Sequence, residues 1–516
     1  MFVISYFNSI PHNWVAIIII IIFNSASYLT PLLIINIDRL VDSQMDNLVL
    51  DLQKLIRQPS ISAKNHGLLE CAYLVSTIMQ KAGIKSEVLH LESSKNAAPI
   101  VYGEARSRSN PKSKTVLFYN HYDVQPVEPY ELWKVDPFGG NIKGNKIFGR
   151  GSSDDKGELI TRIKAIEYLL KETGDVPCNI KFVVEGEEEI GSVHLEKYLS
   201  QFAKKFSCDA IIWESGYVDA KDRPIIGLGT KGILYVELIS RGPSIDVHSS
   251  LAVLIENPAW RIIKAINSMR DDSKAQILIK DWYKEVRGFT PEELYLISSQ
   301  PLPFDEDGFK NKYGINRFVA DARGSKINLA LMGMPTCNIS GITSGYNGKG
   351  PKTVIPSMAK AKIDFRLVPN MSHEKQFERL RNHLYEKGFQ DIKLVFIHGA
   401  SSSRSPLNHP FVIQIKESAV NNFGAMPVIH LSSSGAGPMH IFVRTFGVPC
   451  VSIGCTYIFS NIHSPNEYAR IDLLNRTTKW IANIIKRFAN SINKSKIELS
   501  VQSDLVSDEL GIWKNF

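Results

Sequence analysis

The chain of 516 residues is 44% hydrophobic and 22% charged, with 34 glycines and 25 prolines. This composition is typical of a globular protein and excludes a collagen-like, a largely disordered and a disulfide-scaffold protein, while the length favours two domains over one. The 60 basic and 52 acidic residues give a net charge of +8, but they form no dense basic block, which argues against a nucleic-acid site.

The first 37 residues are an apolar N-terminal extension without Asp, Glu, Lys or Arg. The run from Trp14 to Phe23 and the apolar residues around it are long enough to span a bilayer, which takes roughly 20 apolar residues in a helix. Polar residues and Pro31 interrupt the stretch, however, and no basic residue precedes it as in a signal peptide. Two interpretations therefore stay open: a membrane-targeting segment, or an upstream extension of a soluble enzyme.

The six cysteines contain no CxxC pair, so neither a thiolate zinc site nor a disulfide framework is indicated. A reducing compartment is the simpler assumption. The sequence thus favours a cytoplasmic protein, with membrane anchoring through residues 1–37 as the alternative.

The globular part begins near Asp38 with alternating helix and strand patterns. Apolar residues recur three and four apart in residues 48–56, 68–83 and 159–170, which predicts amphipathic helices. Short apolar runs predict buried strands at residues 115–119, 180–184, 210–213 and 450–454. This alternation predicts an α/β domain with a mostly parallel sheet and helices on both faces.

A different pattern occupies residues 230–398 and predicts a smaller, inserted domain. Its elements in chain order are a strand (232–240), a helix (257–269), two strands (336–342 and 359–367), a helix (374–388) and a strand (392–398). That order is the ferredoxin-like α+β motif. It leaves a discontinuous larger domain of residues 38–229 and 399–492, while residues 271–325 stay unassigned and the polar tail 493–516 is expected to be peripheral.

Metal-type ligands follow the predicted strands of the larger domain. They are His121 and Asp123 after the first run, Glu188 and Glu189 after the second, Glu214 after the third, and His463 nine residues past the last. Ligand sites in open α/β sheets form outside the carboxyl ends of the strands. We therefore expect these side chains at one edge of the sheet.

Two adjacent carboxylates, Asp154 and Asp155, stand among glycines and serines just before a predicted helix. A helix cap accounts for one of them, and a carboxylate shared between metal ions accounts for the other, because helix N-termini favour anions. The candidate ligands are then His121, Asp154, Glu189, Glu214 and His463. Such a set suits two zinc ions, each with one imidazole and one terminal carboxylate, although manganese or cobalt would accept the same ligands.

At this point the sequence resembles the zinc-dependent peptidase and deacylase family that includes carnosinases, glutamate carboxypeptidases, aminoacylases, acetylornithine deacetylase and succinyl-diaminopimelate desuccinylase. The matching stretches, in family order, are HYDVQP, DPFGG, GRGSSDDKG, EGEEEIGS, DVHSS, GPKTVIP, FRLVP and HSPNE. They run from His121 to Glu467, and the resemblance covers roughly residues 40–490.

The resemblance implies a role for each candidate ligand. His121 and His463 would each bind one zinc ion, Asp154 would bridge both ions, and the peptide bond after this aspartate is often cis in relatives. Glu189 and Glu214 would be the terminal ligands, although many relatives have Asp at the second of these positions.

The resemblance also implies catalytic residues. Glu188 would be the general base, and Asp123 would orient the imidazole of His121, as carboxylates beside zinc-bound histidines commonly do. His248 resembles a histidine that relatives direct from the smaller domain to the carbonyl oxyanion, often in the site of the partner subunit. The smaller domain would accordingly serve as a lid and as the interface of a homodimer.

Substrate contacts are implied at two further places. Thr353 and Arg366 match lid residues that hold the substrate's carboxylate, for which a guanidinium is well suited. Gly435 and Gly437 flank Ala436 at a turn where relatives often have Ser or Thr, so that a contact here would come from backbone N–H groups.

The function predicted from the sequence is a dinuclear zinc metallopeptidase acting on dipeptides or small peptides with a free C-terminal carboxylate. HYDVQP resembles the dipeptidase branch of the family. The alternatives are an N-acyl-amino-acid deacylase, a two-metal phosphoesterase and a non-catalytic metal-binding scaffold. The expected partners are a small peptide or N-acyl amino acid and a second copy of the chain, with no nucleic acid and with membrane contact only through residues 1–37.

Four glutamates crowd the stretch EGEEEIGS at residues 185–192. We expect Glu189 to face a metal ion, Glu188 to lie beside the reacting water and Glu187 to face solvent, while Glu185 has no assigned role. Because metal ions would offset the repulsion between these carboxylates, this loop is expected to loosen first when metal is removed.

Overall fold

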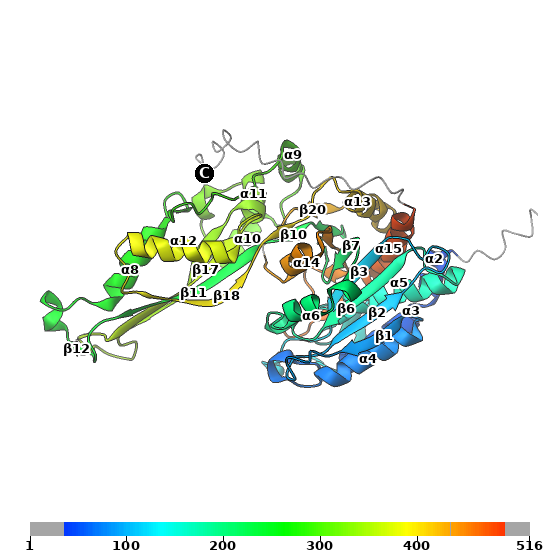
Figure 1. Cartoon of the computed structure of the whole chain (residues 1–516), viewed down its shortest axis with the longest axis horizontal. Helices are drawn as coiled ribbons and strands as arrows, with labels where there is room; N and C mark the ends of the chain where they lie inside the picture. The colour runs from blue at the N-terminus through cyan, green and yellow to red at the C-terminus, as the bar shows by residue number, and fades with distance from the viewer. Residues whose placement is uncertain (1–35, 434, 491–516) are drawn as a thin grey trace, which may run out of the picture.

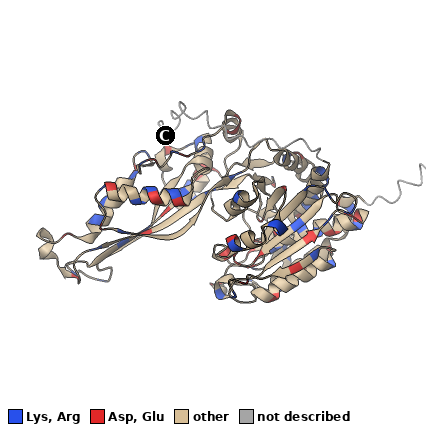
Figure 2. Cartoon of the chain, viewed as in Figure 1, with Lys and Arg blue, Asp and Glu red and all other residues tan. Residues whose placement is uncertain are grey.

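The structure, a computed structural model, describes residues 36–433 and 435–490. Nearly all of the predicted apolar extension (residues 1–37) and the whole of the predicted polar tail (493–516) lie outside these residues. Within the described ranges no helix combines the length and the apolar character needed to cross a membrane. Figure 1 shows two lobes, a broad one and a long, narrow one, and basic and acidic residues are mixed along both (Figure 2).

The broad lobe is built on a sheet that has eight strands in the described part of the chain. Their order is β1 (Lys85–Leu89), β2 (Ile100–Ala105), β6 (Asn179–Glu185), β3 (Thr115–His121), β7 (Ala210–Trp213), β21 (Cys450–Ser452), β9 (Ile225–Gly227) and β20 (Val428–His430). The four central strands, from β6 to β21, run parallel to one another, whereas β1, β2 and the β9–β20 pair join antiparallel. This arrangement confirms the predicted mostly parallel sheet.

Helices cover both faces of this sheet. Successive residues of a strand point to opposite faces, so each face carries its own apolar side chains. Val116 and Phe118 of β3 belong to one apolar core, and Leu117 and Tyr119 belong to another. The first core is covered by α2 (Ile37–Ser43), α3 (Met45–Arg57), α4 (Leu68–Lys81), α5 (Lys156–Thr173), α13 (Pro410–Phe423) and α15 (Ile471–Ala489). The second is covered by α6 (Leu195–Gln201), α7 (Ala203–Phe206) and α14 (Met439–Phe446).

The narrow lobe contains an antiparallel sheet that has four strands among the described residues. Their order is β15 (Thr336–Ser344), β17 (Met358–Leu367), β11 (Gly232–Arg241) and β18 (Lys393–Ala400). α8 (Pro258–Met269) and α12 (His373–Glu386) pack on one face, against the alternate buried residues of β11 and β17. The chain order of these elements is the predicted β-α-β-β-α-β pattern.

Short strand pairs complete the fold. They join β10 (Gly229–Thr230) to β19 (Ser403–Arg404), β12 (Val247–His248) to β16 (Val354–Ile355), β8 (Tyr217–Val218) to β22 (Thr456–Tyr457), and β13 (Arg270–Asp271) to β14 (Gln276–Ile277). A further small sheet has three strands in the order β23 (Tyr468–Arg470), β5 (Lys146–Phe148) and β4 (Asn141–Lys143). The β10–β19 pair lies where the chain passes between the lobes, and β12 lies at the far end of the narrow lobe (Figure 1).

The segment that the sequence left unassigned, residues 271–325, contains α9 (Pro291–Ser299) and α10 (Glu306–Tyr313) and leads into α11 (Ser325–Gly333). Part of it packs against the broad lobe, since Ile297 belongs to the apolar core there. The side-chain amide of Gln300 donates to the Ile429 carbonyl (2.9 Å) and accepts from the Ile429 N–H (2.5 Å). This segment therefore contacts β20, at the edge of the larger sheet.

Candidate metal centre

His121 is the last residue of β3, and its side chain is only 1% exposed. Its Nδ1 lies 3.3 Å from Asp123 Oδ1, and its Nε2 lies 3.1 Å from Asp154 Oδ1. Burial by itself would lower the pKa of this imidazole, but the two carboxylates hold that pKa well above its ordinary value. The predicted orienting carboxylate and the predicted bridging carboxylate thus lie at opposite ends of one buried ring.

Asp154 lies between two imidazoles. While its Oδ1 faces His121, its Oδ2 is 3.2 Å from His463 Nε2, and the same Nε2 is 3.0 Å from Glu189 Oε2. Ligand atoms of Asp154, Glu189 and His463 lie within 4.8 Å of one another, close enough to hold one metal ion. The Asp154–Asp155 peptide bond is cis, as the resemblance implied. One oxygen of Asp154 is thus available on each side of the cluster.

Glu214 follows β7 directly and is buried. Its Oε2 accepts no hydrogen bond from the described residues. Burial, together with the nearby charge of Glu188, raises the pKa of Glu214 well above its usual range, while His121 lowers it. A buried carboxylate oxygen that lacks a donor and lies near a ligand-type imidazole is a fitting position for a cation.

Glu188 and Glu189 begin the short 3₁₀ turn that follows β6. Burial raises the pKa of Glu188 to about 8, and the negative charges of Asp154 and Glu189 act in the same direction against His121. Carboxylates crowded at a buried edge repel one another unless a cation is bound. With two imidazoles at the same edge, this donor set fits divalent zinc.

Asp123 has a second contact that the sequence did not indicate. Its two carboxylate oxygens accept the backbone N–H groups of Glu188 (3.2 Å) and Glu189 (3.0 Å). The side chain of Gln125 also donates to Glu189 Oε2 (2.7 Å). One aspartate therefore fixes the glutamate turn as well as the imidazole of His121.

The expectation that Glu187 faces solvent is wrong. Its side chain is 8% exposed and lies 2.9 Å from His194 Nδ1, and its carboxylate accepts the N–H groups of Ala98 (3.0 Å) and His194 (3.1 Å). These bonds join the glutamate loop to the segment before β2 and to the start of α6. The sequence did not indicate these contacts because two of them are made by backbone N–H groups, which no residue type marks, and one of these groups, that of Ala98, is 89 residues away.

Glu185, which had no expected role, is also buried. It accepts hydrogen bonds from the Tyr119 hydroxyl (2.5 Å) and the Ser192 hydroxyl (2.9 Å). Burial raises the pKa of Glu185 to about 8, while the Tyr119 hydrogen bond lowers it. Of the four glutamates, two therefore anchor the loop and two face the cluster.

Glu467 was quoted in a matching stretch but given no role. Its buried carboxylate accepts the backbone N–H groups of Gly151, Ser153 and Asp154, each at 3.0 Å, and lies 2.9 Å from Arg150 Nη1. It therefore holds the loop that presents the candidate bridging aspartate. Its position inside HSPNE was the signal that could have identified it.

Asp155, the second aspartate of the pair, forms no hydrogen bond with either imidazole among the described residues. Its Oδ2 accepts from Asn120 Nδ2 (2.6 Å) and from the backbone N–H of His121 (3.0 Å). Burial raises the pKa of Asp155 well above its usual range. The two neighbouring aspartates thus have different surroundings, one facing the imidazoles and one holding the end of β3.

His248 and Thr353 do not approach this cluster within one chain. His248 is exposed at the end of β12, with its Nδ1 2.8 Å from Ser250 Oγ. Thr353 is exposed beside it, and its carbonyl accepts the Ser249 N–H (3.1 Å). Figure 1 shows β12 at the far end of the narrow lobe, away from β3, β6 and β7.

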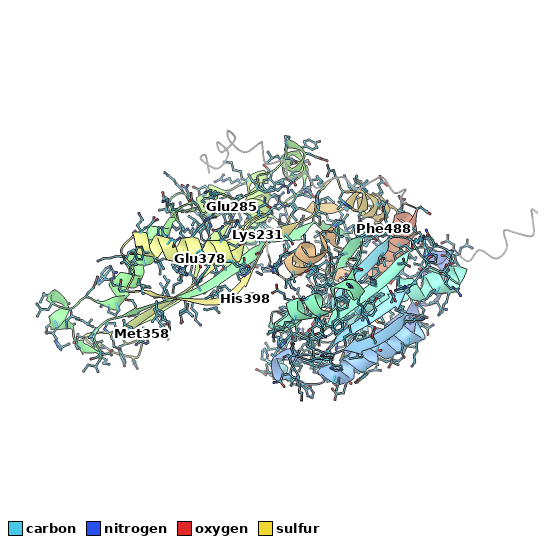
Figure 3. All side chains as sticks on the ribbon, in the orientation of Figure 1. Lys231, Glu285, Met358, Glu378, His398 and Phe488 are labelled. Carbon is cyan, nitrogen blue, oxygen red and sulfur yellow. The ribbon has the colours of Figure 1, made fainter. Side chains whose placement is uncertain are left out.

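Arg366 lies at the opposite end of the narrow lobe from Thr353. It pairs with Ile233 near the start of β11, whereas Met358, at the other end of β17, pairs with Arg241. Figure 3 shows the corresponding separation between Lys231, near the junction of the lobes, and Met358. The two predicted carboxylate-binding residues are therefore not brought together within one chain.

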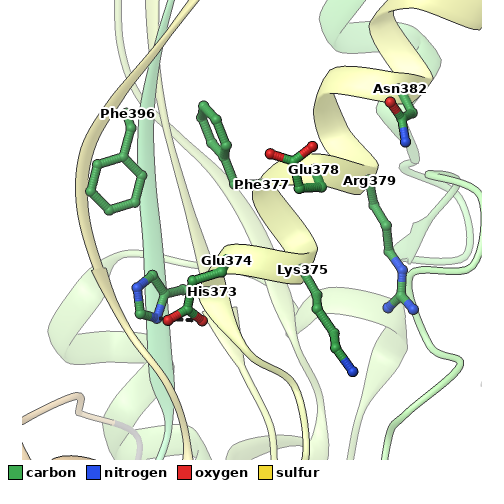
Figure 4. A pocket seen from close by; sticks show the side chains of 8 residues that line it. All are labelled: His373, Glu374, Lys375, Phe377, Glu378, Arg379, Asn382 and Phe396. Carbon is green, nitrogen blue, oxygen red and sulfur yellow. Dashed lines mark ion pairs between the residues drawn. The ribbon is translucent and has the colours of Figure 1, made fainter.

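The predicted glycine turn lies beside the larger sheet. The N–H of Gly435 donates to Ser433 Oγ (3.0 Å), and a Cβ on Gly437 would lie 4.0 Å from the Trp213 ring at the end of β7. A pocket on the narrow lobe lies near this turn, since the ring of its lining residue His373 is 6.4 Å from the His440 ring and His440 Nδ1 is 3.5 Å from the Gly437 carbonyl oxygen. It is lined by His373, Glu374, Lys375, Phe377, Glu378, Arg379, Asn382 and Phe396 (Figure 4).

Comparison with known proteins places this geometry in context. Residues 117–487 match peptidase family M20/M25/M40. The Cys-Gly metallodipeptidase dug1 of Schizosaccharomyces pombe is 31% identical over 358 residues, which cover 67% of this chain and 74% of that protein. The Beta-Ala-His dipeptidase of Homo sapiens is 31% identical over 303 residues, 58% of this chain and 59% of that protein. The crystal structure of the M20 family metallo-carboxypeptidase Sso-CP2 from Sulfolobus solfataricus superposes with a TM-score of 0.77 at 38% identity, covering 86% of this chain and 99% of that one.

Proposed function

Because this chain belongs to peptidase family M20/M25/M40 and is a metal-dependent hydrolase, we propose that it cleaves the amide bond of dipeptides or small peptides with a free C-terminal carboxylate, at a centre of two zinc ions. The observation that carries the proposal is the position of Asp154, with one carboxylate oxygen toward His121 and the other toward His463. The relatives named as Cys-Gly and Beta-Ala-His dipeptidases support a dipeptide substrate.

The proposed ligands divide into two positions that share Asp154. His463 and Glu189 would hold one metal ion, since their ligand atoms already lie together with those of Asp154. His121 and Glu214 would hold the second, where Glu214 Oε2 accepts no hydrogen bond from the described residues. Zinc suits these imidazole and carboxylate donors, and manganese or cobalt would accept them too.

The chemistry requires a base, a polarised carbonyl and a proton for the leaving nitrogen. A bound zinc ion lowers the pKa of water and polarises a carbonyl oxygen. Glu188 takes a proton from the attacking water and then delivers it to the leaving amine. Asp123 fixes the backbone of Glu188 by accepting its N–H at 3.2 Å, so that the base is held at the edge of the cluster.

Substrate binding is proposed to involve both lobes and a second subunit. Arg366, on the narrow lobe near the junction, would bind the substrate's carboxylate together with the N–H group of Gly437, since the N–H of Gly435 donates to Ser433 Oγ. His248 and Thr353 would act in the site of the partner subunit, His248 as a donor to the oxyanion. Support for a homodimer comes from the apolar side chains exposed near β12, which are Val253 (87%), Leu254 (82%) and Trp260 (60%).

The test compares the parent with Glu188→Gln on Cys-Gly, on β-Ala-His and on N-acetyl and N-succinyl amino acids, with zinc content measured in both proteins. We expect the parent to cleave dipeptides and the variant to lose roughly 10²- to 10⁴-fold in rate while keeping its metal, which is the usual contribution of a general base. Turnover of the acylated amino acids alone would favour the deacylase. A metal-loaded parent that cleaves none of these amides would favour the scaffold.

A further inference from the structure

Arg162, on α5, is among the largest fully buried side chains of the chain. It takes no part in the chemistry proposed above, and the sequence pattern marked it only as part of a helix. A buried guanidinium is costly unless its N–H groups are satisfied, and in Arg162 both Nη atoms donate, whereas Nε has no partner among the described residues. Its partners therefore show what it holds in place.

The guanidinium reaches the carboxyl ends of three neighbouring strands. Nη1 donates to the Tyr119 carbonyl (2.9 Å) and to Asn120 Oδ1 (2.7 Å), and Nη2 donates to the carbonyls of Trp213 (2.6 Å), Glu214 and Ile453 (3.2 Å). These acceptors lie at or just beyond the ends of β3, β7 and β21, which are adjacent in the sheet.

An arginine suits this position for a geometric reason. Backbone carbonyls at the ends of strands leave the hydrogen-bonding ladder and need other donors when they are buried. The planar fork of a guanidinium presents five N–H groups in fixed directions, whereas a lysine ammonium presents three from one nitrogen. Arg162 can therefore set the spacing between strand ends as well as neutralise their partial charges.

Two of the strand ends held by Arg162 carry proposed ligands of the same metal position. Asn120, which accepts from the guanidinium, immediately precedes His121 and donates to Asp155 (2.6 Å), which in turn accepts the His121 N–H (3.0 Å). The carbonyl of Glu214 accepts from Arg162 directly. Within the described ranges, no hydrogen bond joins Arg162 to Glu189 or His463, the terminal ligands of the other position, or to Asp154, which both positions share.

A purely structural role would have a different consequence. Arg162 lies in the electrostatic environment of Asp155 and Glu158, and its charge lowers the pKa of both carboxyls, although burial raises each of them overall. If charge compensation were its whole contribution, replacement would weaken folding and affect both metal positions alike. The hydrogen bonds described above instead predict an effect confined to one of them.

We propose that Arg162 is a positioning residue that fixes His121 relative to Glu214 and thereby sets the affinity of the metal position that these two residues share. The proposal rests on the two-metal centre of the proposed function. Arg162 would touch neither metal nor substrate, yet it would affect the affinity of only one of the two metal positions.

The experiment is a titration of chelator-treated protein with zinc, for the parent, Arg162→Met and Arg162→Lys, followed by competition with a chromophoric chelator. We expect two zinc equivalents in the parent. In each variant one equivalent should weaken by roughly 10- to 100-fold, the usual cost of losing a residue that orients metal ligands, while the other keeps the parent's affinity. Arg162→Lys keeps the charge, so it serves if Arg162→Met does not fold.

Lys164→Met is the matched control. Lys164 lies on the same helix, is buried, and pairs with Asp51 (2.6 Å) and Glu167 (2.7 Å) away from the strand ends. Its loss should lower the melting temperature and leave both zinc affinities unchanged. A parent with two equivalents and Arg162 variants with the same two affinities would overturn the role of Arg162 alone. A parent with no second equivalent would overturn the two-metal centre itself, and this proposal with it.

Discussion

The edge of the larger sheet and the far end of the narrow lobe both contain predicted site residues, but in opposite physical surroundings. At the sheet edge His121 is 1% exposed and contacts two carboxylates. At the far end His248 is exposed, and among the described residues its side chain forms hydrogen bonds only with Ser250. The first region is assembled by burial and hydrogen bonds within one chain, whereas the second presents its residues outward.

The difference follows from how each region is built. Parallel strands end side by side, so residues that follow them meet without any further contact being needed. The β12–β16 pair, in contrast, is a separate two-stranded sheet with little core to bury a side chain, and Val253 and Leu254 stay largely exposed beside it. An exposed apolar patch of this kind is typical of a surface that another protein covers.

The substitution His248→Ala tests directly whether the exposed far end of the narrow lobe takes part in catalysis. If His248 stabilises the oxyanion in the partner's site, the rate should fall by roughly 10²- to 10³-fold, the usual cost of one such donor. Zinc content should stay at the parent's level, because the residue lies at the other end of the molecule from the cluster. The measurement is kcat and KM on the preferred dipeptide, with metal analysis on the same samples.

Mixing inactive variants separates a role between subunits from one within a chain. In dimers formed from His248→Ala and Glu188→Gln chains, one of the two sites receives an intact histidine and an intact base, so mixed dimers should regain activity. Random mixing in equal amounts should restore about a quarter of the parent's rate. Two variants that stay inactive after remixing would show that His248 does not act across the dimer.

Asp123→Asn tests how far the sheet edge depends on its hydrogen bonds. The change replaces an acceptor of the Glu188 and Glu189 N–H groups and removes the charge beside His121. Metal affinity should fall by roughly 10- to 100-fold, with a smaller loss of rate at saturating zinc. Asp219→Asn is the control, since Asp219 also accepts two backbone N–H groups, both at 2.9 Å, but its carboxylate pairs with Arg223 and bonds to no proposed ligand among the described residues. Equal zinc affinity in the two variants would contradict the role of Asp123.

The sequence predicted those features that depend on neighbouring residues. Apolar runs located β3, β6 and β7, and the polar residues after them included Asp123, which faces His121, and Glu189, which faces His463, because the ends of neighbouring parallel strands lie at one edge of the sheet. Glu187 and Glu467 were not predicted correctly because their main partners are backbone N–H groups, which no residue type marks in a sequence, and some of these groups are distant, such as Ala98, 89 residues from Glu187, and Asp154, 313 residues from Glu467. The role of Arg162 could not be predicted, because helical periodicity shows which face of a helix is buried but not which strand ends that face contacts.

Glu187→Ala tests the anchoring that the sequence missed. The N–H groups of Ala98 and His194 would lose their acceptor, which costs roughly 1–3 kcal/mol when such groups stay buried. The free energy of unfolding should fall accordingly, while zinc affinity and kcat change little. Glu196→Ala is the control, because its pair with Arg444 is exposed and such pairs contribute roughly 0–1 kcal/mol. A larger loss of zinc affinity than of stability would place Glu187 in the metal site instead.

Removing the metal distinguishes two parts of the cluster itself. From the sequence we expected residues 185–192 to loosen first, but Asp123 accepts the N–H groups of Glu188 and Glu189 and so holds this turn by hydrogen bonds within the chain. His463 is different, because its side chain is 52% exposed and its imidazole is held by Asp154 and Glu189, whose mutual repulsion rises once a dication leaves. We therefore expect chelation to speed hydrogen exchange at the Ser464 amide, which donates to Asn461, more than at the Glu188 and Glu189 amides. Faster exchange at the glutamates than at Ser464 would show that metal ions, and not Asp123, hold the glutamate turn in place.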